Sequence, residues 1–258
     1  MMAGIILNAR GSGNSETIAR IHQLSNLHRC QFFAILEPMI SAAKLGEVCR
    51  ATGFHHFMAN SASLPKICMF WKNSFQLTCL VSHEQSLTFA LGRVDDPVAY
   101  ISIVYAKCLV TDRRSLWNHL SSFASSISLP WIVGGDFNAL TSASEKRGGA
   151  APNRGSMEDF QNLISAASLM DAGYEGSIFT WWNGQQEDRS IFARLDRCLY
   201  NVEWLNYFPS TKVVHLARQY SDHSPLLLSF YDSSSMGRDQ NHSGFRICGS
   251  DTLLFMTF

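Results

Sequence analysis

The chain has 258 residues, of which 46% are hydrophobic and 16% charged, and its 21 basic residues balance its 21 acidic residues. This composition allows a sizeable buried core and excludes a globally disordered chain, and the length suits one large α/β or layered β domain. Because the net charge is zero, no overall basic field argues for nucleic acid, and a polyanionic substrate would have to be held by a local basic strip or by metal ions.

The first part of the chain alternates strands and helices. The segments "GIILN" and "CQFFAILEP" predict buried strands, the second of which ends at Glu37. The segment "NSETIARIHQLSNLHRC" repeats isoleucine and leucine at three-residue steps, which predicts a helix capped by Asn14 or Ser15. A second, shorter helix is expected in "SAAKLGEVCRATG", with Gly53 as its stop.

The middle of the chain is richer in strands. Residues 54–105 hold "FHHFMANS", "ICMFWKNSFQLTCLV", "SLTFALGRV" and "VAYISIVYA", which read as consecutive antiparallel strands. A helix is expected in "DRRSLWNHLSSFASSIS". It is followed by "LPWIVGGDFNAL", an apolar strand that ends in Gly-Gly-Asp. In an extended chain Asp136 and Asn138 would point to the same side, and we expect the two glycines to let the backbone turn closely there.

The last part of the chain returns to helix and strand. Residues 144–156 form a Gly-rich polar loop, after which a helix is expected with Ser156 as its cap and Asp159 three residues on. Further strands are expected in "IFTWWN", "IFARLDRCLY" and "TKVVHLARQYSDHSPLLLSF". This pattern predicts two face-to-face sheets with helices outside, formed by residues 1–231, and a polar, disordered tail at 232–258.

The cysteines and the N-terminus indicate the compartment. Seven cysteines are scattered along the chain without a C-x-x-C pair or a zinc-like spacing, so we expect free thiols in a reducing compartment. The N-terminal "MMAGIILNARGSG" has neither a charged n-region nor a long apolar run. We therefore expect a nuclear or cytoplasmic protein without a secretion signal and without a membrane partner.

Acidic residues lie at the ends of the predicted strands. Glu37 and Asp136 follow apolar runs, Asp222 precedes one, and Asp196 lies between two arginines in "ARLDRCLY". Buried carboxylates are unfavourable unless they are compensated, and Mg²⁺ compensates them while its other ligands are water and phosphate oxygens. Such an ion polarises a phosphate and helps generate a hydroxide. His223, next to Asp222, adds a group that titrates near neutrality.

Each of these features also has a purely structural interpretation. An acid after a strand is usually part of a turn or a helix cap, and "GGD" alone is a turn signal. The "RLDR" segment is as easily a solvated ion-pair face. Tyr105, at the end of "YISIVYA", is more often a core residue, and Asn8 after "GIIL" is equally a plain cap. A catalytic site is indicated only by the whole set of residues in its order along the chain.

That order resembles the endonuclease/exonuclease/phosphatase superfamily, which has the DNase-I-like fold. The resemblance covers residues 3–230 and is carried by G-D-x-N at 135–138 followed by S-D-H at 221–223. The segments "NARGSGN", "VGGDFNAL", "SEKRGG", "FTWWNG", "RLDRCLYNVEWLNYFP" and "HLARQYSDHSPLLL" further resemble the endonuclease domain of plant LINE-type (non-LTR) retrotransposons. In those elements a reverse transcriptase domain follows, and it is absent here, so the chain resembles a truncated or separately encoded fragment.

The resemblance implies an α/β fold, a four-layer α/β sandwich, with Mg²⁺ as cofactor and Mn²⁺ as the alternative ion. Glu37 would be the main carboxylate ligand of the metal, with Asn8 and Asp222 near it. In this family pattern Asp136 would orient and deprotonate the attacking water, and Asn138 would hold the phosphate or that water.

The remaining implied roles concern the phosphate. His223 would contact the scissile phosphate and stabilise its developing charge, with Asp196 bonded behind it to fix its tautomer and orientation. Tyr105 would support the phosphate or the leaving oxygen. The basic residues nearest to these motifs are candidate phosphate contacts or, equally, solvated charges: Lys107, Arg113, Arg114, Lys146, Arg147 and Arg154.

The expected activity is Mg²⁺-dependent nicking of DNA that leaves a 3′-hydroxyl. This choice of substrate follows from the resemblance, since the residues alone indicate only phosphoester hydrolysis. Two alternatives stay open: a phosphatase of the same fold that acts on small or lipid phosphoesters, and a catalytically silent remnant of a retroelement.

Overall fold

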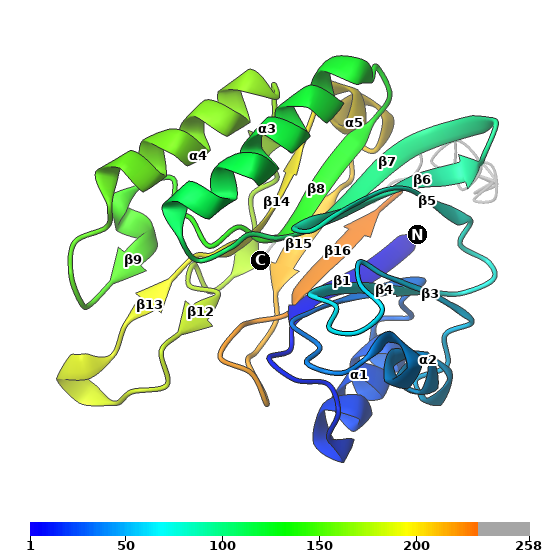
Figure 1. The fold of residues 1–258 in the computed structure, drawn as a ribbon, viewed down its shortest axis with the longest axis horizontal. Coiled ribbons are helices and arrows are strands. Elements are labelled where there is room, and N and C mark those ends of the chain that lie inside the picture. Colours follow the sequence, from blue (N-terminus) through cyan, green and yellow to red (C-terminus); the bar gives the residue numbers. More distant parts are fainter. Residues whose placement is uncertain (232–258) are drawn as a thin grey trace, which may run out of the picture.

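The computed structural model describes residues 1–231, which form four layers (Figure 1). Two large sheets pack face to face, and a pair of helices covers the outer face of each sheet. This arrangement confirms the predicted four-layer α/β sandwich. The polar segment 232–258, which we expected to be a disordered tail, lies outside the described residues.

The helices divide between the two outer faces. One face carries α1 (Ser15–Leu27) and α2 (Ala42–Ala51), and the other carries α3 (Val110–Ser126) and α4 (Arg154–Ala166). Asn14 caps α1 as predicted, because its side chain accepts a hydrogen bond from the Thr17 N–H at 2.7 Å. A further short helix that the sequence pattern did not predict is α5 (Val202–Tyr207).

The predicted cap of α4 is wrong. Asn153, rather than Ser156, caps this helix, since its side-chain oxygen accepts the Ser156 N–H at 2.9 Å. Ser156 lies in the first turn instead, where its hydroxyl accepts a hydrogen bond from Arg113. Asparagine and serine are equally good caps, so the local pattern did not decide between them.

The first sheet has the strand order β11-β15-β16-β1-β2-β4-β3. Its strands are β1 (Met2–Asn8), β2 (Phe32–Leu36), β3 (His56–Ala59), β4 (Ile67–Trp71), β11 (Glu175–Gly176), β15 (Lys212–His215) and β16 (Leu226–Phe230). At its centre, β1 pairs in parallel with β2 and antiparallel with β16.

The second sheet has the order β10-β14-β8-β7-β6-β5. Its strands are β5 (Leu77–His83), β6 (Ser86–Arg93), β7 (Asp96–Tyr105), β8 (Trp131–Asp136), β10 (Met170–Asp171) and β14 (Asp196–Tyr200). A small third sheet lies at one side of the molecule (Figure 1). Its strands, in order, are β12 (Trp181–Trp182), β13 (Phe192–Ala193) and β9 (Lys146–Arg147). Two single 3₁₀ turns, Ala143–Glu145 and Glu187–Arg189, complete the described elements.

The central strands are apolar on both faces because both faces are covered. Ile6 of β1 joins the core between the two sheets, whereas its neighbours Ile5 and Leu7 pack under α1 and α2. In β8, Ile132 points into the inter-sheet core, and Val133 packs under α3 and α4. The two-residue alternation of strands thus distributes one apolar run over two cores.

The topology brings several strand ends to one edge of the sandwich. Since β1 and β2 are parallel, Asn8 pairs with Leu36, directly before Glu37. The parallel β7 and β8 likewise place Tyr105 opposite Asp136. The strands β14 and β16 run antiparallel to these neighbours, so their starts, rather than their ends, reach the same edge.

Two compositional expectations concern the whole chain. Six cysteines of the described residues are free thiols, as expected, and Cys248 lies outside them. Within residues 1–231, every helix is too short or too polar to cross a lipid bilayer.

Candidate active site

Asp136, the last residue of β8, is the centre of a buried hydrogen-bond network. Its side chain is only 1% exposed, and its Oδ2 accepts the Asn8 Nδ2–H at 3.0 Å. Its Oδ1 accepts the backbone N–H of Asn138 at 2.9 Å. The Asn138 side chain donates in turn to the Ala106 carbonyl at 2.7 Å. The carboxylate is therefore held by partners at the ends of β1 and β8, and Asn138 is tied in turn to the residue that follows β7.

Asn138 reaches Asp136 through a turn rather than along an extended chain. Its φ is +47°, in the left-handed region, and this is why the two-residue alternation that we expected does not apply. The glycines also differ from expectation, since both lie inside β8. A Cβ on Gly134 would lie 2.5 Å from Ile6 of the facing sheet, and one on Gly135 would lie 2.0 Å from the Val104 carbonyl oxygen. They allow close strand and sheet packing rather than a turn.

His223 lies between two carboxylates. Its Nδ1 bonds to Asp196 Oδ2 at 2.8 Å, and its Nε2 lies 3.8 Å from Asp136 Oδ2 and 3.5 Å from Asn8 Nδ2. Asp196 begins β14 directly opposite Asp136, and its backbone N–H donates to the buried Thr180 hydroxyl at 3.0 Å. The imidazole is thus fixed from one side by Asp196, and its other nitrogen points toward Asp136 and Asn8.

Burial and neighbouring charges shift the pKa values of this network. Burial raises the pKa of Asp136 to about 7, and the charge of Asp196 adds to the rise, while His223 and the bonds from Asn138 and Asn8 oppose it. Burial alone would lower the pKa of His223, but Asp196 and Asp136 outweigh burial and raise it to about 9. The two groups are close enough that a proton on one changes the affinity of the other.

Glu37 and Asp222 lie on either side of one arginine. Arg10 Nη1 donates to Asp222 Oδ2 at 2.6 Å, and Arg10 Nε lies 3.7 Å from Glu37 Oε2. The Asp222 Oδ2 also accepts the Trp181 Nε1–H at 2.9 Å. Lys66 approaches the other oxygen of Glu37 at 3.7 Å. The two acids belong to one cluster that opens toward solvent, since their side chains are 12% and 20% exposed.

Tyr105 joins this cluster at the end of β7. Burial raises its pKa, and the nearby carboxylate of Glu37 adds to the rise, so the phenol keeps its proton at neutral pH. Its backbone N–H donates to Gln85 O at 3.0 Å, and the next residue, Ala106, donates to Asp136 O at 2.8 Å. The structure therefore brings all the predicted site residues into one contiguous group: Asn8, Glu37, Tyr105, Asp136, Asn138, Asp196, Asp222 and His223.

Four further residues support this group, although we assigned them no role from the sequence. Arg10 and Trp181 contact Asp222, and Thr180 accepts the N–H of Asp196. Ser221 ties the His223 loop to β1, because its hydroxyl donates to Asn8 O at 2.6 Å and accepts the His223 N–H at 3.0 Å. All four lie in the segments that carry the family resemblance, but most of their partners are distant in sequence.

The candidate phosphate contacts are mostly engaged within the protein. Arg113 is buried and donates to Asn138 O and Ser156 Oγ, so it is a structural residue and the expectation of a phosphate contact is wrong. Three others form exposed ion pairs, Lys107 with Glu84, Arg114 with Asp159 and Arg154 with Glu158. Lys146 Nζ donates to Ala150 O at 2.6 Å, and Arg147 stacks over Phe192 at 4.4 Å.

The arginines of "RLDR" are buried, so the interpretation as a solvated ion-pair face is wrong. The Arg197 side chain is fully buried, and it pairs with Glu145 at 2.8 Å and with Asp171 at 3.1 Å. Arg194 pairs with the same two acids at 3.2 and 2.8 Å. The two arginines flank Asp196 in the chain. Their ion pairs join the start of β14 to β10 and to the turn before β9.

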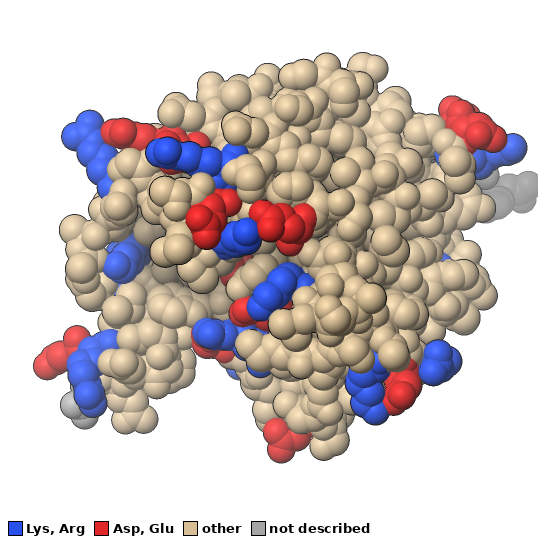
Figure 2. All heavy atoms as spheres, viewed as in Figure 1, with Lys and Arg blue, Asp and Glu red and all other residues tan. Residues whose placement is uncertain are grey.

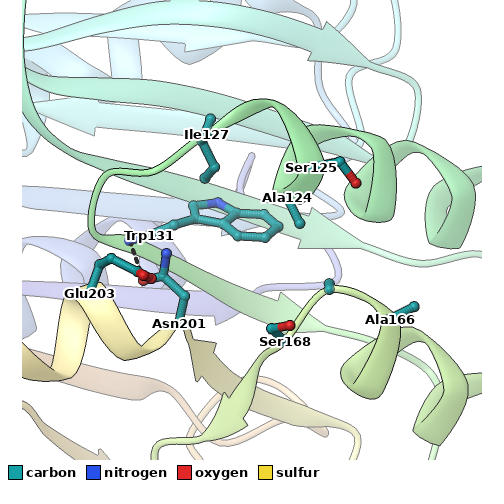
Figure 3. A pocket seen from close by; sticks show the side chains of 9 residues that line it. Ala124, Ser125, Ile127, Trp131, Ala166, Ser168, Asn201 and Glu203 are labelled. Atoms are coloured by element: carbon teal, nitrogen blue, oxygen red, sulfur yellow. Dashed lines mark hydrogen bonds between the residues drawn. The ribbon is translucent and has the colours of Figure 1, made fainter.

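Two cavities lie at opposite ends of β8. One of about 230 Å³ adjoins Asn138 and is lined by Lys146, Asn153 and Trp181 among others. The other, of about 270 Å³, lies at Trp131, the first residue of the strand (Figure 3). There Asn201 accepts the Trp131 backbone N–H at 2.8 Å, as the dashed line marks. Only the first cavity is close to the acidic cluster.

Solved structures share this arrangement of layers. The endonuclease domain of TRAS1, a telomere-specific non-LTR retrotransposon, superposes with a TM-score of 0.68 over 90% of this chain and 100% of that one, at 11% identity. The protein has the DNase-I-like fold. An AP endonuclease from Archaeoglobus fulgidus gives a TM-score of 0.70 at 9% identity, over 89% of this chain and 99% of that one.

A third DNase-I-like structure is a 3′-5′ exonuclease from Neisseria meningitidis, with a TM-score of 0.66 and 15% identity over 89% of this chain and 99% of that one. No protein-family model matches the chain, and no curated protein sequence matches it. At these identities the likeness shows the fold alone.

Two groups of side chains have the chemistry to hold a metal ion. Asp136, Asp196 and His223 bring ligand atoms within 4.8 Å of one another, but these atoms also serve the bonds within the network. The side chains of Glu37 and Asp222 are partly exposed to solvent. Asp222 Oδ1 is buried and has no hydrogen-bond partner among residues 1–231. Oxygen donors of this kind suit Mg²⁺, which favours carboxylates together with water and phosphate.

Proposed function

We propose that this protein is a Mg²⁺-dependent phosphodiesterase that nicks DNA and leaves a 3′-hydroxyl. The observation that carries the proposal is the position of His223. It lies between Asp136 and Asp196 and is adjacent to Asp222 in the metal-ligand group. A buried acid–base network beside a cluster of oxygen ligands is the pair of elements that phosphodiester hydrolysis requires.

Glu37 and Asp222 would hold the ion, with Asn8 beside them. The bound cation would supply charge neutralisation to the phosphate and favour loss of the leaving oxygen. Glu37 is set at the end of β2 by a left-handed backbone with φ +47°, and its own carbonyl accepts the Gly11 N–H at 2.9 Å. These constraints fix the direction of the carboxylate.

Asp136 would orient the attacking water and accept its proton. Its oxygens are oriented by Asn8 and Asn138, so little reorganisation is needed when the water arrives. The raised pKa of Asp136 suits a group that must both accept and release a proton near neutral pH. Asn138, beside the open cavity, would hold the phosphate or the water.

His223 would contact the scissile phosphate through Nε2. Its bond from Nδ1 to Asp196 fixes the orientation of the ring and stabilises the charged imidazolium, which is the form that binds a phosphate oxygen. Tyr105 keeps its phenolic proton and would donate it in a hydrogen bond to the phosphate or to the leaving oxygen.

The choice of DNA as substrate is supported by fold likeness, and the distribution of charge indicates how DNA would be held. The TRAS1 structure is described as an endonuclease domain of a non-LTR retrotransposon, which agrees with the narrower resemblance of this sequence. Basic and acidic side chains are interspersed across the middle of the face in Figure 2, without a broad basic field. Phosphate binding would therefore be local to the site, and affinity for DNA would depend on the metal.

A plasmid assay tests the proposal. We expect Mg²⁺ to support conversion of supercoiled to open-circular DNA and EDTA to abolish it. Asp136→Ala should lower the rate by at least about a hundredfold. Release of phosphate from small esters without nicking would favour the phosphatase alternative. Failure of the folded protein in both assays would favour the catalytically silent remnant.

A further inference from the structure

Arg10 links the two carboxylates that we assign to the metal. Its Nη1 donates to Asp222 Oδ2 at 2.6 Å, and its Nε lies 3.7 Å from Glu37 Oε2. The Arg10 side chain is 50% exposed, so the guanidinium also faces solvent. One cationic group therefore reaches acids from two different loops and the space where a substrate would arrive.

The backbone sets the direction of this side chain. Arg10 has a φ of +45°, in the left-handed region that is unfavourable for a residue with a Cβ. Its N–H lies 3.3 Å from Asn8 Oδ1, and the next residue, Gly11, donates its N–H to Glu37 O at 2.9 Å. Such a conformation persists where the surroundings hold it, so the approach of Arg10 to Glu37 and Asp222 is built into the turn.

Lys66 provides an internal comparison. Its Nζ lies 3.7 Å from Glu37 Oε1, as close as Arg10 is to the other oxygen of the same carboxylate. The ion pairs of the described residues connect Lys66 to Glu37 but not to Asp222. Its side chain is 44% exposed, similar to that of Arg10. The two residues thus share charge and distance to Glu37, but Arg10 alone of the two forms ion pairs with both acids.

We propose that Arg10 competes with the divalent cation for Glu37 and Asp222 and, once displaced, binds a phosphate oxygen of the substrate. The inference rests on the proposed function and concerns how its site is regulated. A carboxylate oxygen that accepts a guanidinium hydrogen bond is less available to a metal. The planar guanidinium matches phosphate as well as carboxylate, so it can exchange one for the other.

This exchange links metal binding to substrate binding. The metal ion and the substrate phosphate both favour the state in which Arg10 has left Glu37 and Asp222. Binding of either one should therefore strengthen binding of the other. Without Arg10 the metal should bind more tightly. Part of the coupling between metal binding and substrate binding should then disappear.

A metal titration of the full chain tests the competition. Protein freed of metal by EDTA and dialysis is titrated with Mn²⁺ by calorimetry, as wild type, Arg10→Met and Lys66→Met. We expect Arg10→Met to bind Mn²⁺ at least about fivefold more tightly, and Lys66→Met to change the affinity by less than about twofold. Equal tightening in both variants would show a simple charge effect and would overturn the proposal, as would an unchanged affinity in Arg10→Met.

The second half of the proposal needs a DNA-binding measurement without cleavage. Fluorescence anisotropy of a short labelled duplex is compared in EDTA and in Ca²⁺, which serves as the probe cation. In the wild type we expect Ca²⁺ to raise DNA affinity, and in Arg10→Met we expect this gain to be at least about threefold smaller. An equal gain in both proteins would refute the transfer of Arg10 to phosphate.

A Glu37→Gln variant separates failure of this inference from failure of the proposed function. If the wild type binds Mn²⁺ and Glu37→Gln weakens that binding, while Arg10→Met leaves it unchanged, only the role of Arg10 is refuted. If the wild type does not bind Mn²⁺, both the metal site and the competition are refuted. Circular dichroism melting of every variant checks that each one is folded.

Discussion

Asp196 faces Asp136 across the antiparallel strands β14 and β8, and the imidazole of His223 lies between their carboxylates. The strand register determines the spacing of the two acids, because they are paired residues where neighbouring strands of one sheet end and begin. His223 comes from a loop of the other sheet. The network therefore forms only when the two sheets are packed together.

If Asp196 acts through His223, the two residues should behave as one unit. We expect Asp196→Asn and His223→Gln each to lower the nicking rate by at least about a hundredfold, and the double variant to be no slower than His223→Gln alone. Single-turnover nicking at saturating Mg²⁺ measures the three rates. Losses that multiply in the double variant would indicate independent roles.

Gly135 is predicted to be intolerant of any side chain. A Cβ there would lie 2.0 Å from Val104 O, and the residue has a φ of +145°. Gly11 has a φ of +119° with open space around its Cβ position, so it controls for the backbone strain of a large positive φ. We expect Gly135→Ala to lose at least about 2 kcal/mol more free energy of unfolding than Gly11→Ala in urea. Equal losses would contradict the packing argument.

The buried pair of Arg197 and Glu145 should be costly to break. Arg197→Met leaves the carboxylate of Glu145, whose side chain is 7% exposed, without its closest partner. Removing one member of a buried ion pair typically costs about 3–5 kcal/mol. Arg154, which is 89% exposed and pairs with Glu158, is the matched control, and Arg154→Met should change stability by less than about 1 kcal/mol. Urea unfolding at pH 7 measures both.

The same network predicts how stability depends on pH. Burial alone would raise the pKa values of Glu145 and Asp171, but the bonds and charges of Arg197 and Arg194 outweigh burial and lower both pKa values. A lowered carboxylate pKa stabilises the fold above the pKa of the unfolded chain, and this stabilisation is lost as the pH falls through the lowered value. We expect the free energy of unfolding to fall below about pH 4.5.

Arg197→Met provides the control for the acid dependence. Without Arg197, the pKa of Glu145 should lie higher, and the variant should lose less stability than the wild type between about pH 5 and pH 3. Urea unfolding across this range gives both curves. Parallel curves would mean that other carboxylates cause the acid sensitivity.

The four-layer fold and the strand ends that carry the site could be predicted, because the sequence patterns that indicate them are local. Apolar runs and three-residue helical steps mark the strands and helices, and covering both faces of a sheet makes its central strands continuously apolar. The placement of Glu37, Asp136 and Asp222 at strand ends then follows from the alternation of elements. Their order along the chain supplied the family resemblance.

The parts that the sequence did not reveal depend on distant partners. Arg197 and Glu145 are 52 residues apart, and a local reading of "RLDR" contains no sign that the arginines are buried. Arg10 and Asp222 are separated by 212 residues, so the role of Arg10 emerged only from the structure. The cap at Asn153 was missed for a different reason, since Ser156 is an equally good cap by type.

The chemical state of the nicked end tests most directly whether the site cleaves DNA and leaves a 3′-hydroxyl. Supercoiled plasmid is incubated with the protein and Mg²⁺, and the purified product is given to a DNA polymerase with labelled nucleotides, without any treatment of its ends. We predict open-circular product that incorporates label at once, and neither product nor label with Asp136→Ala. Absence of nicking, or nicks that are extended only after a 3′-phosphate is removed, would contradict the account.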